Sequence, residues 1–326
     1  MDTEGREKFW NVLKDLHDNS EETKEKLKEV SKCPKFLCRF RSLNEHSLQQ
    51  LQENTLFFSS ADYYDDPFDT YFYINFNQLS SDFKDIQEEF SKGKGDFVDR
   101  FSQLVSSTGE NPNKVISNLY KESLDSLKIR DDLISLRNFI QQGLFSICFC
   151  EDPYNETLWL KYANNYSGFV QIYNFEHPGT ILCGKGEACP KCNTAKFFPY
   201  IYPIYYSNEK YGATNYAIGV RVLDIVLRNS HIFPPDFIDS VKRSIMWEIE
   251  RISLIKKKCH ENDQEWRMIR PEIIKERSFV KMKPCKIIIG LRTTKYERKL
   301  IISAAKIAGI QEIHELYIND IRSTEY

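Results

Sequence analysis

Residues 36–69 read FLCRFRSLNEHSLQQLQENTLFFSSADYYDDPFD, and this stretch predicts a strand, a short helix, a second strand and an acidic loop. Apolar side chains recur at every second position of the first strand, a period typical of a strand with one buried face: Phe36, Cys38 and Phe40. Ser42 followed by Glu45 fits a capping box at the start of the helix.

The loop at the end of this stretch is unusually acidic. It follows the second predicted strand, residues 55–60, and carries three carboxylates around a proline: Asp65, Asp66 and Asp69. Binding residues collect in loops that follow strands. We therefore expect this stretch to form part of a site.

Composition limits the class of protein. The chain has 326 residues, of which 41% are hydrophobic, enough for a substantial core. Its 45 basic and 47 acidic residues nearly cancel, which argues against a general nucleic-acid binder. No apolar run approaches the roughly 20 residues that span a bilayer, and the polar start of the sequence is unlike a signal peptide. We expect a cytoplasmic protein that makes no use of a membrane.

We divide the chain into a helical lead-in at 1–35 and a single α+β domain at 36–326. Apolar spacings of three and four residues predict a helical insertion at 80–142. Strands are predicted at 144–150, 168–175 and 265–270, and the C-terminal part reads as a β-α-β unit. The predicted fold is α+β, with a mixed, mostly antiparallel central β-sheet.

A long helix is also predicted at 236–258, where isoleucine and valine recur at three- and four-residue steps. Lys256 to Lys258 would end this helix, where cations suit the helix macrodipole. Solvation is then a sufficient explanation for the three lysines.

Cysteines gather in the loop at 177–196. Cys189-Pro-Lys-Cys192 is a knuckle that places two thiolates on one tetrahedral metal, and Cys183 precedes it. The fourth ligand would come from one of three residues: Cys259, His260 or His177. We expect a structural zinc site, with unliganded cysteines as the main alternative.

Carboxylates and arginines supply further chemistry. Asp66, Asp69 and Glu265 could hold a divalent metal for phosphodiester hydrolysis. In the simpler interpretation, Asp66 begins a turn and Asp69 caps the next element. Arg39 and Arg41 stand two positions apart on a strand, so both project from the same face.

Several segments resemble a bacterial family, the domain of unknown function numbered twenty-nine seventy-one. The matching segments are CRFRSLNEHSLQQLQENTLFFSSADYYDDPFD, FSICFCEDPYNETLWLKYANNYSGFVQIYNF, DQEWRMI and KIIIGLRTTKYERKLIISAAKIAGI, spread over positions 36 to 310. Phe40, Tyr64-Asp65 and Cys150 depart from the family's usual tyrosine, Phe-Asn and serine. The CPKC segment is not part of the family pattern.

The layout of these segments is similar to that of the ADP-ribosyltransferase superfamily. The similarity implies that Glu265 is the catalytic carboxylate and that Arg41, or Arg39, holds the phosphates or ribose of NAD. The NAD-binding residues implied in this way are Arg39, Arg41, Ser59, Ser60, Tyr63, Tyr64, Asp66 and Asp69. The fold it implies is the mixed, mostly antiparallel sheet described above.

Three functions follow from these patterns. The first is an NAD-dependent, ADP-ribosyltransferase-like enzyme, such as a toxin or phage-defence effector, that modifies a protein or nucleic acid. The second is a metal-dependent nuclease that uses the clustered carboxylates. The third is a non-catalytic partner-binding protein with a structural zinc, in which Arg41 and Glu265 would form a buried ion pair.

Overall fold

The computed structural model describes residues 1–16, 20–66, 68–78, 141–176, 180–182, 201–228, 230, 235–270, 279–317 and 324–325, with scattered residues between 81 and 138. Most of the predicted helical insertion at 80–142 lies outside these residues, and so do Cys183, Cys189, Cys192 and His177.

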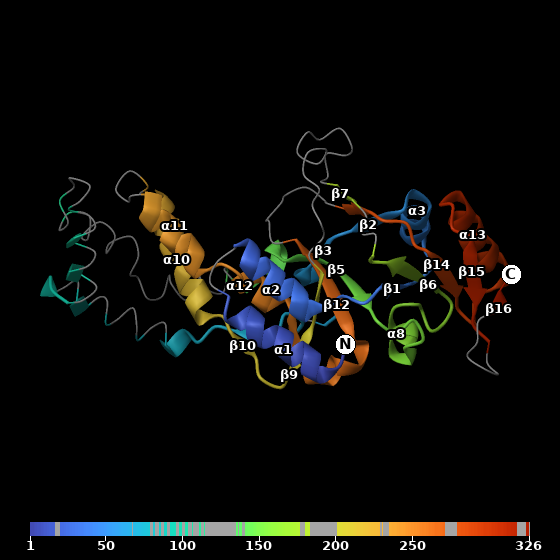
Figure 1. Ribbon diagram of the computed structural model, residues 1–326, viewed down its shortest axis with the longest axis horizontal. Helices are drawn as coiled ribbons and strands as arrows, with labels where there is room; N and C mark the ends of the chain where they lie inside the picture. Colours follow the sequence, from blue (N-terminus) through green and yellow to red (C-terminus); the bar gives the residue numbers. More distant parts are fainter. Residues whose placement is uncertain are drawn as a thin grey trace.

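A nine-stranded sheet forms the centre of the fold (Figure 1). Its strands are β1 (Phe36–Arg41), β3 (Ser59–Ser60), β5 (Phe145–Cys150), β6 (Phe169–Asn174), β8 (Ile201–Pro203), β12 (Glu265–Arg270), β14 (Lys286–Ile289), β15 (Glu312–Glu315) and β16 (Thr324–Glu325). The strand order is β16-β15-β14-β6-β1-β5-β12-β8, and β3 also pairs with β5. Every pairing in this sheet is antiparallel except that of β14 with β15. The predicted α+β class and mostly antiparallel sheet are confirmed.

The remaining strands form smaller sheets. These are β4 (Phe72–Tyr73) with β10 (Tyr211–Gly212), β9 (Tyr205–Ser207) with β11 (Ile255–Lys257), and β2 (Thr55–Phe57) with β7 (Thr180–Leu182) and β13 (Phe279–Lys281). The described helices are α1 (Thr3–Lys14), α2 (Glu21–Ser31), α3 (Glu45–Glu53), α8 (Glu156–Lys161), α10 (Thr214–Arg228), α11 (Pro235–Ser244), α12 (Glu248–Ser253) and α13 (Lys295–Ile307), with 3-10 turns η1 (Ala61–Tyr63) and η2 (Lys258–Asp263).

Helices cover both faces of the sheet at β14. Ile287 and Ile289 pack with α3 and α13, whereas Ile288 packs with α8 on the other face. This alternation follows from the two-residue period of a strand. Because α13 joins β14 to its parallel neighbour β15, the predicted C-terminal β-α-β unit is confirmed.

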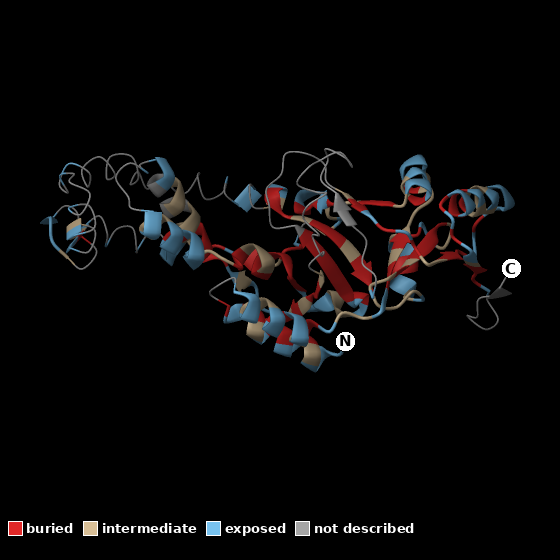
Figure 2. Cartoon of the chain, turned by 45° about the horizontal axis from the view of Figure 1, so that its top comes forward, coloured by how far each residue is buried: buried red, intermediate tan, exposed pale blue. Residues whose placement is uncertain are grey.

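The N-terminal helices pack against the other end of the sheet. α1 buries Phe9 and Leu13 in a cluster that also contains Tyr202, Ile204 and Ile255 of β11. In Figure 2 the outer sides of these helices are exposed, while the sheet behind them is buried. The predicted lead-in is thus helical, and α1 belongs to the core.

Three local predictions were wrong. Phe36, expected on the buried face of the first strand, is 46% exposed, whereas Leu37 is buried. The capping box of α3 is formed by Asn44 and Ser47, because the Ser42 hydroxyl instead donates to the carbonyl oxygen of Tyr162 at 3.0 Å. The predicted helix at 236–258 is broken at Trp247, whose φ is 66°, and residues 255–257 form β11 instead. Pairing with β9 overrides the helical spacing of the isoleucines.

Within the described part of the chain, no helix is both long and apolar enough to cross a bilayer. In Figure 1, α10 and α11 lie on one side of the central strands β5 and β12 and the β14-α13-β15 unit lies on the opposite side.

Candidate functional site

A cavity of about 420 Å³ opens where β1 and β5 part, a size typical of ligand-binding cavities. β1 pairs with β6 over all six of its residues, but with β5 only through Cys38 and Cys150. Because the ladder between β1 and β5 is so short, side chains from both strands reach the opening. The lining residues include Cys38, Arg39, Arg41, Asn44, Ser59, Tyr63, Tyr64, Asp65, Asp66, Asp69, Cys148, Cys150, Tyr162, Lys256, Asp263 and Glu265.

The residues predicted to bind NAD, together with the predicted catalytic residue, meet at this cavity, with one exception. Arg39 and Arg41 come from β1, Ser59 from β3, and Glu265 from the start of β12. The acidic loop supplies Tyr63, Tyr64, Asp65, Asp66 and Asp69. Ser60 does not line the cavity, because its buried hydroxyl donates to the Asp62 carboxylate.

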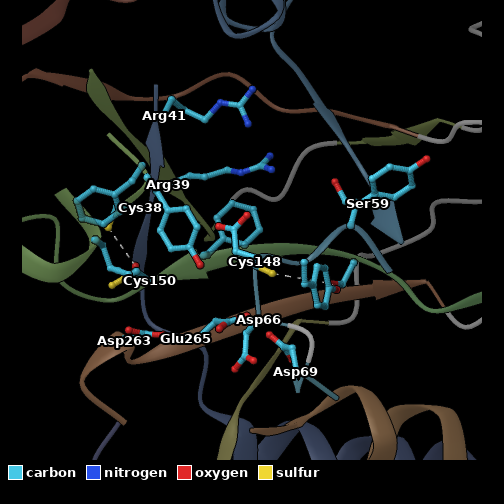
Figure 3. A pocket seen from close by; sticks show the side chains of 18 of the residues that line it. Cys38, Arg39, Arg41, Ser59, Asp66, Asp69, Cys148, Cys150, Asp263 and Glu265 are labelled. Atoms are coloured by element: carbon cyan, nitrogen blue, oxygen red, sulfur yellow. Dashed lines mark hydrogen bonds between the residues drawn. The ribbon is translucent and has the colours of Figure 1, made fainter. Parts of the chain in front are cut away.

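One wall of the cavity carries two arginines that are not paired with a carboxylate among the described residues. Figure 3 shows the side chains of Arg39 and Arg41 extending in the same direction from β1. Arg41 Nη2 donates to Gln50 Oε1 at 2.9 Å, and the buried Nη1 of Arg39 has no hydrogen-bond partner in the described structure.

The two guanidinium groups of this wall favour an anionic ligand. Burial, and then the charge of Arg39, lowers the pKa of Arg41 to about 9. Burial also lowers the pKa of Arg39. A cation whose charged form is disfavoured by desolvation is stabilised when an anion binds beside it.

The other side of the cavity is a buried network of three carboxylates and two cations (Figure 3 labels the carboxylates). Arg267 Nη2 donates to both oxygens of Asp69 at 2.8 and 2.7 Å, and its Nε donates to Glu265 at 2.6 Å. Lys256 Nζ donates to Glu265 at 2.8 Å and to Asp263 at 3.1 Å. We call these five residues the acidic network.

These cations keep Glu265 ionised. Its burial alone would raise the pKa of the carboxyl, but the charges of Arg267 and then Lys256 lower it well below its usual range. In the same way, burial would lower the pKa of Lys256, but Glu265 and Asp69 raise it. The Glu265 carboxylate is therefore a fixed negative charge at neutral pH.

Hydrogen bonds with two other parts of the chain hold the backbone of Glu265 in place. Its N–H donates to the Tyr206 hydroxyl at 2.8 Å, and its carbonyl oxygen accepts from the Arg6 guanidinium at 2.9 Å. Arg6 also donates to Glu151 at 2.7 Å. Helix α1 thus supports the position of a side chain that lies far away in the sequence.

The acidic loop is held against the network at two points. Asp69 is bound by Arg267, and Asp66 Oδ2 lies 3.0 Å from His260 Nε2. The guanidinium carbon of Arg267 lies over the Tyr64 ring, 4.9 Å from the ring centre. The Tyr64 hydroxyl forms a hydrogen bond with the Ser146 hydroxyl. Tyr63, by contrast, is 82% exposed at the cavity wall and free to contact a flat ligand group.

Sequence reasoning missed Lys256, Arg267 and His260. Lys256 was interpreted as a solvated residue at a helix end, which is wrong: it lies on β11 and is only 4% exposed. Arg267 could have been found, because it stands two residues after Glu265 on a strand and must share its face. His260 was considered only as a zinc ligand, and its ring lies beside the Asp66 carboxylate.

The zinc site stays a prediction. Cys183, Cys189 and Cys192 lie outside the described residues, and Cys259 is an exposed free thiol on η2. Among the residues that are described, no group of three or more His, Cys, Asp or Glu side chains is arranged to hold a metal.

The ion pair expected for a non-catalytic protein does not form between the two described residues concerned. Glu265 pairs with Lys256 and Arg267, and Arg41 bonds to Gln50. Both side chains line the same cavity without neutralising each other.

Three comparisons with known proteins found no match to this chain. The chain matches no protein-family model, and no curated protein or solved structure is significantly similar to it. The resemblance to the bacterial family described above therefore stays a prediction.

Proposed function

We propose that this protein is an NAD-using, ADP-ribosyltransferase-like enzyme and that NAD binds in the cavity between β1 and β5. The observation that carries the proposal is the shared cavity, which has Arg39 and Arg41 on one wall and the ionised Glu265 on another. In this proposal the arginines bind phosphate or ribose oxygens, since the planar guanidinium fork suits such groups.

Glu265 would act on the bond between nicotinamide and ribose. Cleavage of that bond develops positive charge on the ribose, as in glycoside hydrolysis. A fixed carboxylate beside the sugar stabilises this charge without the cost of reorganisation. Each oxygen of this carboxylate accepts one of these bonds, Oε1 from Arg267 and Oε2 from Lys256, and keeps a second lone pair with which it could accept from a ribose hydroxyl.

Exposed Tyr63 is a second contact for the same ligand. Its ring is available to stack on a flat heterocycle at the cavity wall. Asp69 is bound by Arg267 and Asp66 lies beside His260, so in this proposal these two cavity-lining residues hold the loop in position.

The direct test uses the unchanged chain and NAD labelled in its adenylate part. We expect NAD to bind and free nicotinamide to appear, with label transferred to a protein or nucleic acid when cell extract is added. Label released from NAD labelled in nicotinamide, monitored in parallel, counts every cleavage, and the fraction of adenylate label that joins a macromolecule separates transfer from hydrolysis. The proposal fails if the folded protein neither binds nor consumes NAD and nothing in the extract becomes labelled.

A metal-dependent nuclease is the second candidate, and Lys256 favours it. A lysine beside carboxylates is a common feature of nuclease sites, and Lys256 contacts Asp263 and Glu265 and lies 3.7 Å from Asp69. Against it, Asp69 and Glu265 are already bound to Arg267, which leaves fewer oxygens for a metal.

For this candidate we expect Mg²⁺- or Mn²⁺-dependent cleavage of DNA or RNA that a chelator stops. The measurement is gel analysis of labelled single- and double-stranded substrates. Cleavage that survives simultaneous replacement of Asp66, Asp69 and Glu265 by their amides would exclude these carboxylates as the metal site.

A further inference from the structure

The cavity contains a pair of thiols that the proposed function does not use. Cys38 on β1 and Cys150 on β5 are directly opposite each other in the antiparallel ladder. Cys38 Sγ lies 3.2 Å from the carbonyl oxygen of Cys150, and both residues are buried beside the cavity that they line. In Figure 3 the Cys38 thiol points to the backbone carbonyl of Cys150, and the Cys150 thiol donates to the carbonyl oxygen of Asp152 at 3.4 Å.

The backbone spacing of this pair suits a disulfide. Directly opposed residues in antiparallel strands have Cα atoms about 4.5 or about 5.5 Å apart, depending on the pair type. Disulfides join Cα atoms that are about 4.4 to 6.8 Å apart. Both spacings fall in this range, so the bond needs side-chain rotation and little movement of the strands.

We propose that Cys38 and Cys150 are a redox-active pair that a small organic disulfide converts to a reversible cross-strand disulfide. One thiolate attacks the small disulfide and releases its first thiol, which leaves a mixed disulfide on the protein. The second cysteine then displaces the other small thiol and joins the two protein sulfurs. The protein loses two hydrogen atoms, and the small disulfide is reduced to two thiols.

The surroundings of the two cysteines determine how the oxidant reaches them and how fast the cross-link forms. The oxidant would enter through the cavity, since Cys38 and Cys150 line it. Burial, and then the nearby Cys150 side chain, raises the pKa of Cys38, so its thiolate is scarce at neutral pH. The cross-link is therefore expected to form slowly and to form faster as the pH rises.

The bond would tie the strands at the point where they part. Cys38 and Cys150 are the single register pair between β1 and β5, and Arg39 follows Cys38 directly. A bond there would close a loop between residues 112 positions apart, which restricts the unfolded chain. Oxidised protein should therefore unfold at a higher temperature than reduced protein. This inference does not depend on the proposed function.

The test treats the native full chain with hydroxyethyl disulfide, blocks remaining thiols with N-ethylmaleimide in denaturant, and maps tryptic peptides. We expect peptide 36–39 to be linked to peptide 138–161, with fragmentation placing the bond at Cys150 and not at Cys148. Dithiothreitol should release both peptides. The Cys148→Ser variant is the matched control and should keep the cross-link, because Cys148 is opposite Arg267.

Other outcomes would overturn the inference. Full alkylation of both Cys38 and Cys150 after prolonged treatment at alkaline pH would do so, and so would a bond from either one to a different cysteine. The Cys150→Ser variant should lose both the cross-link and the upward shift in unfolding temperature. Mapping the unchanged chain answers the question even if a variant fails to fold.

Discussion

We expect the Glu265→Gln variant to cleave NAD about 100- to 1000-fold more slowly than the unchanged chain, on the proposed function. Glutamine keeps the shape of the side chain but removes the negative charge that would face the developing charge on ribose. Because Arg39 and Arg41 remain in place, NAD affinity should change far less than turnover. Nicotinamide release and equilibrium binding of NAD, measured on the same preparation, separate the two effects.

The control for this variant is Glu261→Gln, four residues earlier on η2. Its carboxylate accepts from the Thr3 hydroxyl in an exposed position and is not among the cavity-lining residues. It should retain the turnover of the unchanged chain. Since Glu265 also belongs to the acidic network, the assay needs a temperature at which thermal unfolding shows the variant to be folded. Turnover that is unaffected in the folded Gln variant would remove Glu265 from the proposed chemistry.

Replacement of Arg267 by methionine should have the largest effect on stability. Arg267 is 1% exposed and donates to Asp69, Glu265 and the carbonyl oxygen of Ser253. Among the described residues, its removal leaves Asp69 and Glu265 with Lys256 as their one cationic partner. Loss of one partner from a buried ion pair costs about 3–5 kcal/mol. Urea unfolding should therefore show a free energy of unfolding lower by that amount.

Arg292→Met provides the comparison, because Arg292 is exposed. Its effect should stay within about 0.5 kcal/mol. Adding Asp69→Leu to Arg267→Met should cost less than the sum of the two single changes, because the partners share one interaction. A loss below about 1 kcal/mol for Arg267→Met would show that water or rearrangement compensates the acidic network, contrary to our description of it.

Much of the candidate site could be predicted because it depends on local geometry. The alternation in β1 requires Arg39 and Arg41 to project together, whatever the strand pairs with. The same rule applied to β12 would have linked Glu265 with Arg267. The acidic loop was also recognisable, since its proline and carboxylates are typical of a chain that leaves a strand.

Other features could not be predicted because competing local signals are equally strong. Ser42 and Asn44 are both suitable N-cap residues. Asn44 caps α3, because the Ser42 hydroxyl donates to the carbonyl oxygen of Tyr162. Isoleucines at three- and four-residue spacing are compatible with one helix or with a helix followed by a strand. The pairing of Ile255–Lys257 with Tyr205–Ser207 decided for the strand, and Lys256 became buried as a result.

The sequence alone determined the α+β class, the strand that carries the two arginines, and the residue types available for chemistry, because each follows from short-range periodicity. Only the tertiary structure decided that β5 joins β1 to β12, so that Arg41 and Glu265 line one cavity. It also decided that Lys256 and Arg267 bind the carboxylates and that Cys38 is opposite Cys150 in the ladder. These contacts join segments far apart in the chain, and no local pattern specifies which strands become neighbours.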